Sequence, residues 1–150
     1  MTEKAERFKW AVAGFELAVA RFEAVAYDEG ASAQETYIPL CESLNWCDSI
    51  ADRVRKWERP ELMRAIEYVR NAVHHQWLDA LDYRPSYGEG KYGEGTYGGG
   101  AWKWKPVGEI PHRGPDDRRP LYGNLLEGKS ALDTLRSFKT EIVDKIDGSR

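Results

Sequence analysis

The chain has 150 residues, which is enough for one domain with a sizeable apolar core. Its 22 lysines and arginines nearly balance its 25 aspartates and glutamates, so the net charge of −3 excludes a broad phosphate-neutralising surface and leaves only local contacts to nucleic acid. Two cysteines exclude a disulfide framework, and a charged N-terminus without any long apolar run predicts a cytoplasmic protein with neither a secretion signal nor a membrane span.

The first element is predicted to be a helix near residues 3–27. Thr2 suits its N-cap, and Gly30 suits the left-handed position after its end. Apolar residues recur at alternating spacings of four and three, which is the pattern of one buried helix face. They are Phe8, Val12, Phe15, Val19, Phe22 and Ala26.

A second helix is predicted near 33–57, because Ser32 and Glu35 have the spacing of a capping box. Its apolar stripe consists of Tyr37, Leu40, Leu44, Cys47, Ala51 and Val54.

Pro60 fits the first turn of a third helix near 60–82. The stripe of this helix consists of Leu62, Ile66, Val69, Val73, Trp77 and Ala80.

Ser130 is the expected N-cap of a last helix near 130–147, with Leu132, Leu135, Phe138, Ile142 and Ile146 on its apolar side. Since each stripe must be buried to stabilise its helix, we expect an all-α, antiparallel four-helix bundle that forms a single domain over 1–150.

Residues 83–122 interrupt this pattern as a long insertion before the last helix. The run "YGEGKYGEGTYGGGAW" places an aromatic residue at 87, 92, 97 and 102 with glycine between, which is too rich in glycine for a helix. The following "AWKWKPV" alternates and predicts a short strand. Two interpretations of this irregular segment stay open: a binding surface, or a low-complexity insertion.

The third helix contains the stretch "YVRNAVHHQW", with two of the three histidines of the chain. At about 100° per residue, Arg70 lies at the border of the apolar stripe with His74 beside it. Asn71 and His75 lie on the side away from the core, together with Tyr68. We therefore expect His75 to face water or another molecule.

The sequence from Arg70 to His75 resembles the R-x4–6-H motif of HEPN domains, with a polar residue directly after the arginine. The resemblance implies a bundle of four to five helices with the motif on a late helix. Many HEPN proteins are metal-independent ribonucleases, often toxins or antiviral effectors, that act as dimers with two motifs facing one cleft. Trp77 departs from the tyrosine that partner-silenced HEPN toxins carry two places after the histidine, so modification by such a partner does not carry over.

This resemblance implies an endoribonuclease that leaves a 2′,3′-cyclic phosphate. His75 would serve as acid or base, Arg70 would hold the phosphate, and Asn71 would orient one or the other. It also implies a homodimer, with Tyr68, Asn71 and His75 near its two-fold axis, and an antitoxin or effector partner. The expected RNA-binding side chains, by stacking or polar contact, are His74, Tyr92, Tyr97, Trp102 and Trp104.

Other interpretations of the same residues stay open. The chain could be a HEPN-like dimeric module that only binds a partner, and the polar positions could be a solvated helix face. Adjacent histidines cannot both point at one metal from a regular helix, so we expect neither a metal nor another cofactor. Glu35 and Glu42 on the second helix are the candidate orienting carboxylates.

Overall fold

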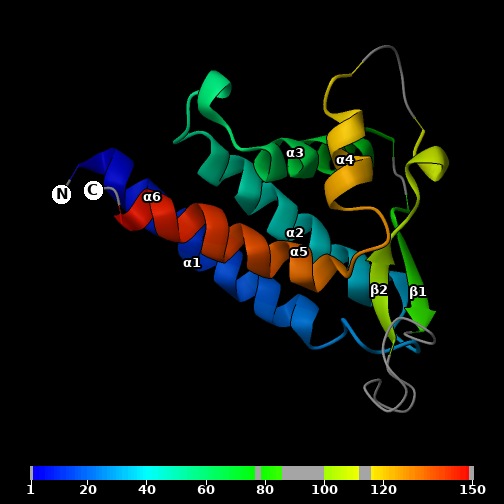
Figure 1. The fold of residues 1–150 in the computed structure, drawn as a ribbon. Helices are drawn as coiled ribbons and strands as arrows, with labels where there is room; N and C mark the ends of the chain where they lie inside the picture. The colour runs from blue at the N-terminus through cyan, green and yellow to red at the C-terminus, as the bar shows by residue number, and fades with distance from the viewer. Residues whose placement is uncertain (1, 77–78, 86–99, 112–115, 149–150) are drawn as a thin grey trace, which may run out of the picture.

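The computed structural model describes residues 2–76, 79–85, 100–111 and 116–148, with side chains omitted at 75, 76, 85, 147 and 148. These residues form a mostly helical protein of five helices with a small antiparallel hairpin before the last two (Figure 1). The expected predominance of helix is confirmed. The expected count of four helices was too low, because residues 83–122 contribute a strand and a further helix.

Helices α1 (Glu3–Glu23) and α2 (Ala33–Ala51) begin where their capping residues predict. The Ala5 amide donates to Thr2 Oγ1 over 3.2 Å. The Glu35 amide donates to Ser32 Oγ over 3.1 Å, and the Glu35 carboxylate accepts from the Ser32 amide, which completes the capping box.

Both of these helices end earlier than predicted. Beyond Glu23 the chain turns, and Gly30 is not in the left-handed region, since the positive φ among the described glycines belongs to Gly128. The end of α2 is set by Arg59, which follows the short 3-10 turn η1 (Lys56–Glu58). Its guanidinium donates to the carbonyls of Ala51 and Val54, each over 3.2 Å, and so satisfies the open end of α2.

Helix α3 is described over Glu61–Gln76 and does not reach the predicted end at 82. The chain instead enters strand β1 (Leu81–Pro85), which pairs antiparallel with β2 (Gly100–Trp104). The Tyr37 hydroxyl accepts from the Leu81 amide over 2.8 Å, which fixes the first residue of the hairpin to α2. The short strand expected from "AWKWKPV" is therefore confirmed at Gly100–Trp104, and its partner strand was missed.

Helix α4 (Arg119–Leu125), which follows the 3-10 turn η2 (Val107–Glu109), begins inside the segment 83–122 that was predicted to be irregular. It packs on α3, with the Tyr122 ring 5.8 Å from that of Tyr68 (Figure 1). Seven residues with a proline near the start give no helical periodicity that a sequence alone would reveal.

The last helix begins after Ser130 as predicted, since the Asp133 amide donates to Ser130 Oγ over 3.3 Å. It runs as α5 (Ala131–Phe138), one π turn η3 (Lys139–Val143) and α6 (Asp144–Gly148).

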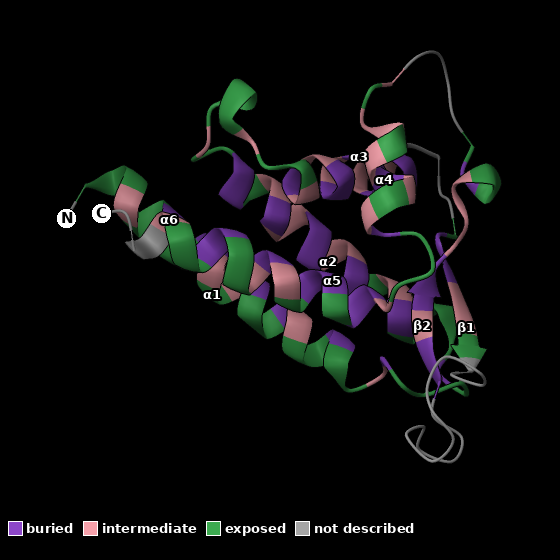
Figure 2. Cartoon of the chain, viewed as in Figure 1, coloured by how far each residue is buried: buried purple, intermediate pink, exposed green. Residues whose placement is uncertain are grey.

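The core follows the predicted stripes, with buried residues on the inward sides of the helices in Figure 2. Val12, Val19, Tyr37, Val54, Leu62 and Ile146 lie half-buried at its margin, and Trp77 lies outside the described residues. Stripe residues that are buried include Phe8, Phe15, Phe22, Leu40, Leu44, Cys47, Ile66, Val69, Val73, Leu132, Leu135, Phe138 and Ile142.

Within the described ranges, no helix has the length and apolar character needed to cross a bilayer.

Candidate functional site

Arg70 lies on α3 with its side chain 26% exposed, at the border of the core as the helical pattern predicts. Its Nε and Nη2 donate to Asn45 Oδ1, each over 3.4 Å, and its Nη1 donates to Asn71 Oδ1 over 3.3 Å. The carboxylate of Asp48 lies 3.8 Å from Nη1. Two side chains of α2 and one of α3 therefore hold the guanidinium in place.

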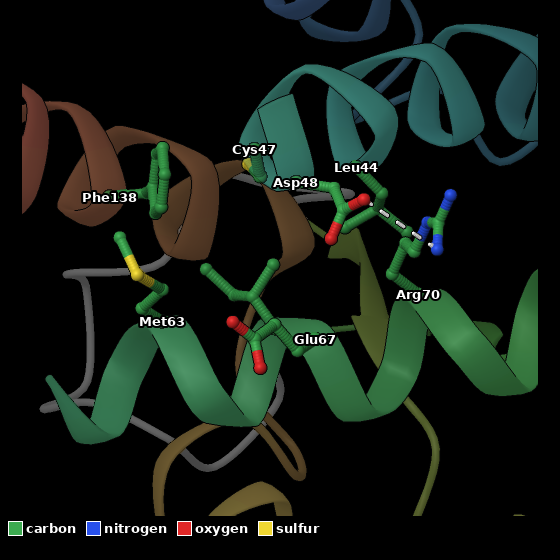
Figure 3. Close-up of a pocket in the computed structure, with 8 residues that line it drawn as sticks. Leu44, Cys47, Asp48, Met63, Glu67, Arg70 and Phe138 are labelled. Carbon is green, nitrogen blue, oxygen red and sulfur yellow. Dashed lines mark ion pairs between the residues drawn. The ribbon is translucent and has the colours of Figure 1, made fainter. Parts of the chain in front are cut away.

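Figure 3 shows this arginine at one end of a narrow crevice between α2 and α3. Met63 and Phe138 line its other end, while Leu44, Cys47, Asp48, Ile66 and Glu67 line it between them. No part of the crevice is wide enough for a water molecule. A phosphate could reach Arg70 only from the outer edge, where the guanidinium meets solvent.

The candidate acid–base group, His75, has its backbone in the last turn of α3, while its side chain lies outside the described residues. Asn71 and His74 are half-buried. The structure therefore brings Arg70 and Asn71 together through a hydrogen bond. It places His75 five residues along the same helix and does not describe its contacts.

Tyr68 is not on an open face of α3, contrary to the expectation from the helical pattern. It is 5% exposed, because α4 covers this side of the helix. Glu67 is also enclosed, with its carboxylate 2.8 Å from Arg59 and 3.6 Å from Arg118. Tyr68 therefore cannot contribute to a dimer contact in this conformation.

The aromatic residues proposed to stack on RNA separate into two groups. Trp104 is fully buried, and its Nε1 donates to Thr134 Oγ1 over 2.9 Å, so no face of its indole is available to a base. Trp102 is half-buried against Tyr83, and its Nε1 donates to the Asp28 carbonyl over 2.9 Å. Tyr92 and Tyr97 lie outside the described residues.

The carboxylates expected to orient the site have other partners. Glu35 completes the capping box of α2, and Glu42 pairs with Arg21 of α1. Asn45 and Asp48 take the position beside Arg70 instead. The sequence feature that could have indicated this position is the spacing of three between Asn45 and Asp48 on α2. Each of them directly follows a buried residue of the apolar stripe, Leu44 or Cys47.

A wider groove of about 800 Å³ lies between α1 and α2, with Ile146 at one margin. The Arg53 guanidinium lies 5.3 Å from the centre of the Phe8 ring, across the floor of this groove. Indole rings and cations in one hollow are suited to an anionic ligand with a flat ring. The groove is lined by Lys4, Arg7, Phe8, Trp10, Ala11, Trp46, Ser49, Asp52 and Arg53.

The described part of the chain contains no cluster of side chains that could bind a metal ion. Among the described residues, no three His, Cys, Asp or Glu side chains are grouped so as to hold an ion. Cys41 and Cys47 are free thiols, and burial raises the pKa of each. A raised pKa keeps a thiol protonated at neutral pH, which disfavours a nucleophilic role.

Comparisons of the chain with known protein families, with curated proteins and with solved structures found no match in any of the three.

Proposed function

We propose that this protein is a metal-independent endoribonuclease of the HEPN type, acting in the cytoplasm as a homodimer. The observation that carries the proposal is the arginine of the motif, whose guanidinium is held at the open edge of α3 by Asn45 and Asn71. A planar cation fixed in this way is suited to bind a phosphate bidentately and to offset charge in the transition state.

The proposed reaction uses Arg70 to bind the phosphate and His75 to transfer protons. The ribose 2′-oxygen attacks the phosphorus, the bond to the 5′-oxygen breaks, and a 2′,3′-cyclic phosphate forms. One imidazole takes the 2′-hydroxyl proton and a second gives a proton to the 5′-oxygen. In the proposed dimer, His75 of each protomer supplies one of these groups, and Asn71 positions the phosphate beside Arg70.

The proposal needs two protomers because the crevice of one chain is closed to substrate. A single-stranded RNA would lie along the open end of α3, between two copies of Arg70. An antitoxin or effector that covered this end would inhibit the protein. The HEPN resemblance, including this mode of assembly, rests on the motif and on its placement in a helical bundle.

The test is incubation of the purified protein with total RNA in the presence of EDTA. Arg70→Ala and His75→Ala should lose cleavage, with thermal midpoints close to that of the wild type. His74→Ala should retain most activity. A wild-type protein inert on a broad range of RNAs, or a His75→Ala variant as active as wild type, would refute the catalytic proposal.

The second candidate function is a HEPN-like dimeric module that binds without cleaving. The groove between α1 and α2 favours it, because this hollow has room for a ligand. Fluorescence anisotropy with a labelled single-stranded RNA separates the two candidates. Loss of binding in a Lys4→Ala/Arg53→Ala variant, with no cleavage by the wild type, would support the module. Alanine at Tyr92 and Tyr97 tests the glycine-rich segment in the same assay.

A further inference from the structure

The groove between α1 and α2 is formed by one side of each helix, with small residues among the large ones that line it. On α1, Lys4, Arg7 and Ala11 recur at spacings of three and four, and on α2, Trp46 and Ser49 are three apart. The small side chains of Ala11 and Ser49 leave a hollow of about 800 Å³. This volume lies in the range of small-molecule sites, roughly 300–1,000 Å³.

Two contacts across the groove show how the helices are aligned. The Arg53 guanidinium, in the turn that directly follows α2, lies 5.3 Å from the centre of the Phe8 ring near the start of α1. Further along α1, the Trp46 indole packs so closely on Gly14 that a Cβ at position 14 would overlap the ring. The two helices are therefore antiparallel, and the residues that line the groove have fixed neighbours across it.

This alignment gives the two ends of the groove different chemistry. One end has three cations, Lys4 and Arg7 on α1 and Arg53 after α2. The indoles of Trp10 and Trp46 lie further along, toward the other end. Residues 46 and 53 are separated by roughly 10 Å at the rise of a helix. That is about the distance from the phosphate to the far edge of the base in one nucleotide.

We propose that this groove is a binding site for one purine nucleoside monophosphate. The phosphate lies among Lys4, Arg7 and Arg53, where the guanidiniums donate to its oxygens. The base stacks on the indoles of Trp10 and Trp46, and a purine offers the larger ring for this contact. Trp10 is 70% exposed, so one face of its ring is accessible to a ligand.

The remaining charges at the groove narrow the class of ligand. Asp52 also lines it, and its carboxylate would repel a ligand that had only anionic and apolar groups. A nucleotide instead offers hydrogen-bond donors to this carboxylate, from the ribose hydroxyls and the base. Glu3 pairs with Arg7 at the cationic end, and the whole chain has a net charge of −3. This balance suits a single phosphate better than the many phosphates of a long strand.

This inference goes beyond the proposed ribonuclease and does not rest on it. On α2, Asn45 and Asp48 contact Arg70, whereas Trp46 and Ser49 line the groove, so the two sites lie on different faces of one helix. Arg70→Ala should abolish RNA cleavage and leave nucleotide binding unchanged. Failure of one proposal is therefore distinguishable from failure of the other. For the second candidate function, the inference specifies the ligand of the groove.

Isothermal titration calorimetry with adenosine 5′-monophosphate (AMP) tests the site. The wild type should bind AMP with a dissociation constant in the micromolar range, and Arg53→Ala should bind it at least about tenfold more weakly. Arg55→Ala is the matched control, since it removes the same charge two residues further on. The Arg55 guanidinium lies 5.8 Å from the Trp57 ring, outside the groove. No binding of AMP by the wild type up to about 1 mM, or equal binding by Arg53→Ala and the wild type, would overturn the proposal.

A second pair of variants tests the stacking of the base. Trp10→Ala should weaken AMP binding, whereas Trp57→Ala, at an indole that is 79% exposed and outside the groove, should not. Adenosine and inorganic phosphate should each bind at least about tenfold more weakly than AMP, because each lacks one half of the ligand. Thermal midpoints establish that the variants are folded.

Two further outcomes of these titrations would contradict the assignment. Inorganic phosphate that binds as tightly as AMP would make the groove a simple anion site. A single-stranded oligonucleotide that displaces AMP and binds more tightly than AMP would assign the groove to a nucleic-acid strand. Either result would overturn the proposal of a mononucleotide site.

Discussion

The guanidinium of Arg70 lies 3.8 Å from the carboxylate of Asp48, and these two residues face each other from α3 and α2. A guanidinium that binds phosphate would be expected to face solvent with no competing anion. The Arg70 guanidinium instead has the Asp48 carboxylate of the same chain beside it. Asp48 is 45% exposed, so the pair is screened and contributes little to stability. Its effect should therefore appear in RNA binding.

We expect Asp48→Asn to bind RNA several-fold more tightly than the wild type. The substitution removes an anion that competes with the phosphate for Arg70, and a change of about 1 kcal/mol corresponds to roughly fivefold in affinity. Fluorescence anisotropy at constant salt measures it. Glu61→Gln, which removes one exposed charge from the start of the same helix, is the control for net charge. Equal tightening in both variants would mean that Asp48 has no specific effect on Arg70.

The indole of Trp104 should act as a structural residue. It is fully buried and donates to Thr134 Oγ1, so Trp104→Ala should lower the free energy of unfolding by about 3–5 kcal/mol. Urea denaturation measures this loss. Trp57 is 79% exposed, and Trp57→Ala should change stability by no more than about 0.5 kcal/mol. A Trp104→Ala protein that is as stable as wild type but defective in RNA binding would return Trp104 to the substrate site.

A pair of tyrosines tests the packing of α4 on α3. Tyr68 Oη is buried and has no hydrogen-bond partner among the described residues, so Tyr68→Phe should be neutral or stabilising by up to about 1 kcal/mol. Tyr122 Oη donates to the Lys105 carbonyl over 2.5 Å, so Tyr122→Phe should destabilise by about 1–2 kcal/mol. Thermal unfolding of both variants gives the comparison. The opposite order would contradict the assigned hydrogen bonding.

The sequence predicts the three long helices and the last one because each has a long apolar period and a cap with a specific spacing. Ser32 with Glu35 and Ser130 with Asp133 fix two helix starts to within one residue. The ends were harder to predict. That of α2 depends on Arg59, whose guanidinium reaches back to carbonyls five and eight residues earlier. This contact exists only in the folded chain.

The candidate site was predictable only in part, for a similar reason. Arg70 was placed at the border of the core by its own helix, without reference to the rest of the chain. Asn45 and Asp48 approach it from α2, and only the packing of two helices makes them neighbours. Tyr68 was misplaced because a helical wheel assumes a single covered side, whereas α3 is covered by both α2 and α4.

Alkaline pH should destabilise the protein through groups that are buried in their neutral form. Burial, reinforced by a hydrogen bond to the Asp79 carboxylate, raises the pKa of Tyr37 above its ordinary value of 10.0. Burial likewise raises the pKa of Cys47 well above 9.0. The folded state therefore holds these protons more tightly than the unfolded state does.

The sign of the effect follows from this difference. Below pH 9 both states are protonated, and the stability is fully present. As pH rises above 9 and then above 10, the unfolded chain ionises first, so the free energy of unfolding falls until each folded-state pKa is passed. The slope approaches about 1.4 kcal/mol per pH unit for each group.

Urea titrations between pH 8 and 11 should show this decline. Tyr37→Phe, although less stable at pH 8 for lack of its bond to the Leu81 amide, should decline less steeply above pH 10. Tyr27→Phe, at a tyrosine that is 54% exposed, should keep the wild-type slope. An unchanged slope in Tyr37→Phe would show that Tyr37 does not carry the alkaline transition.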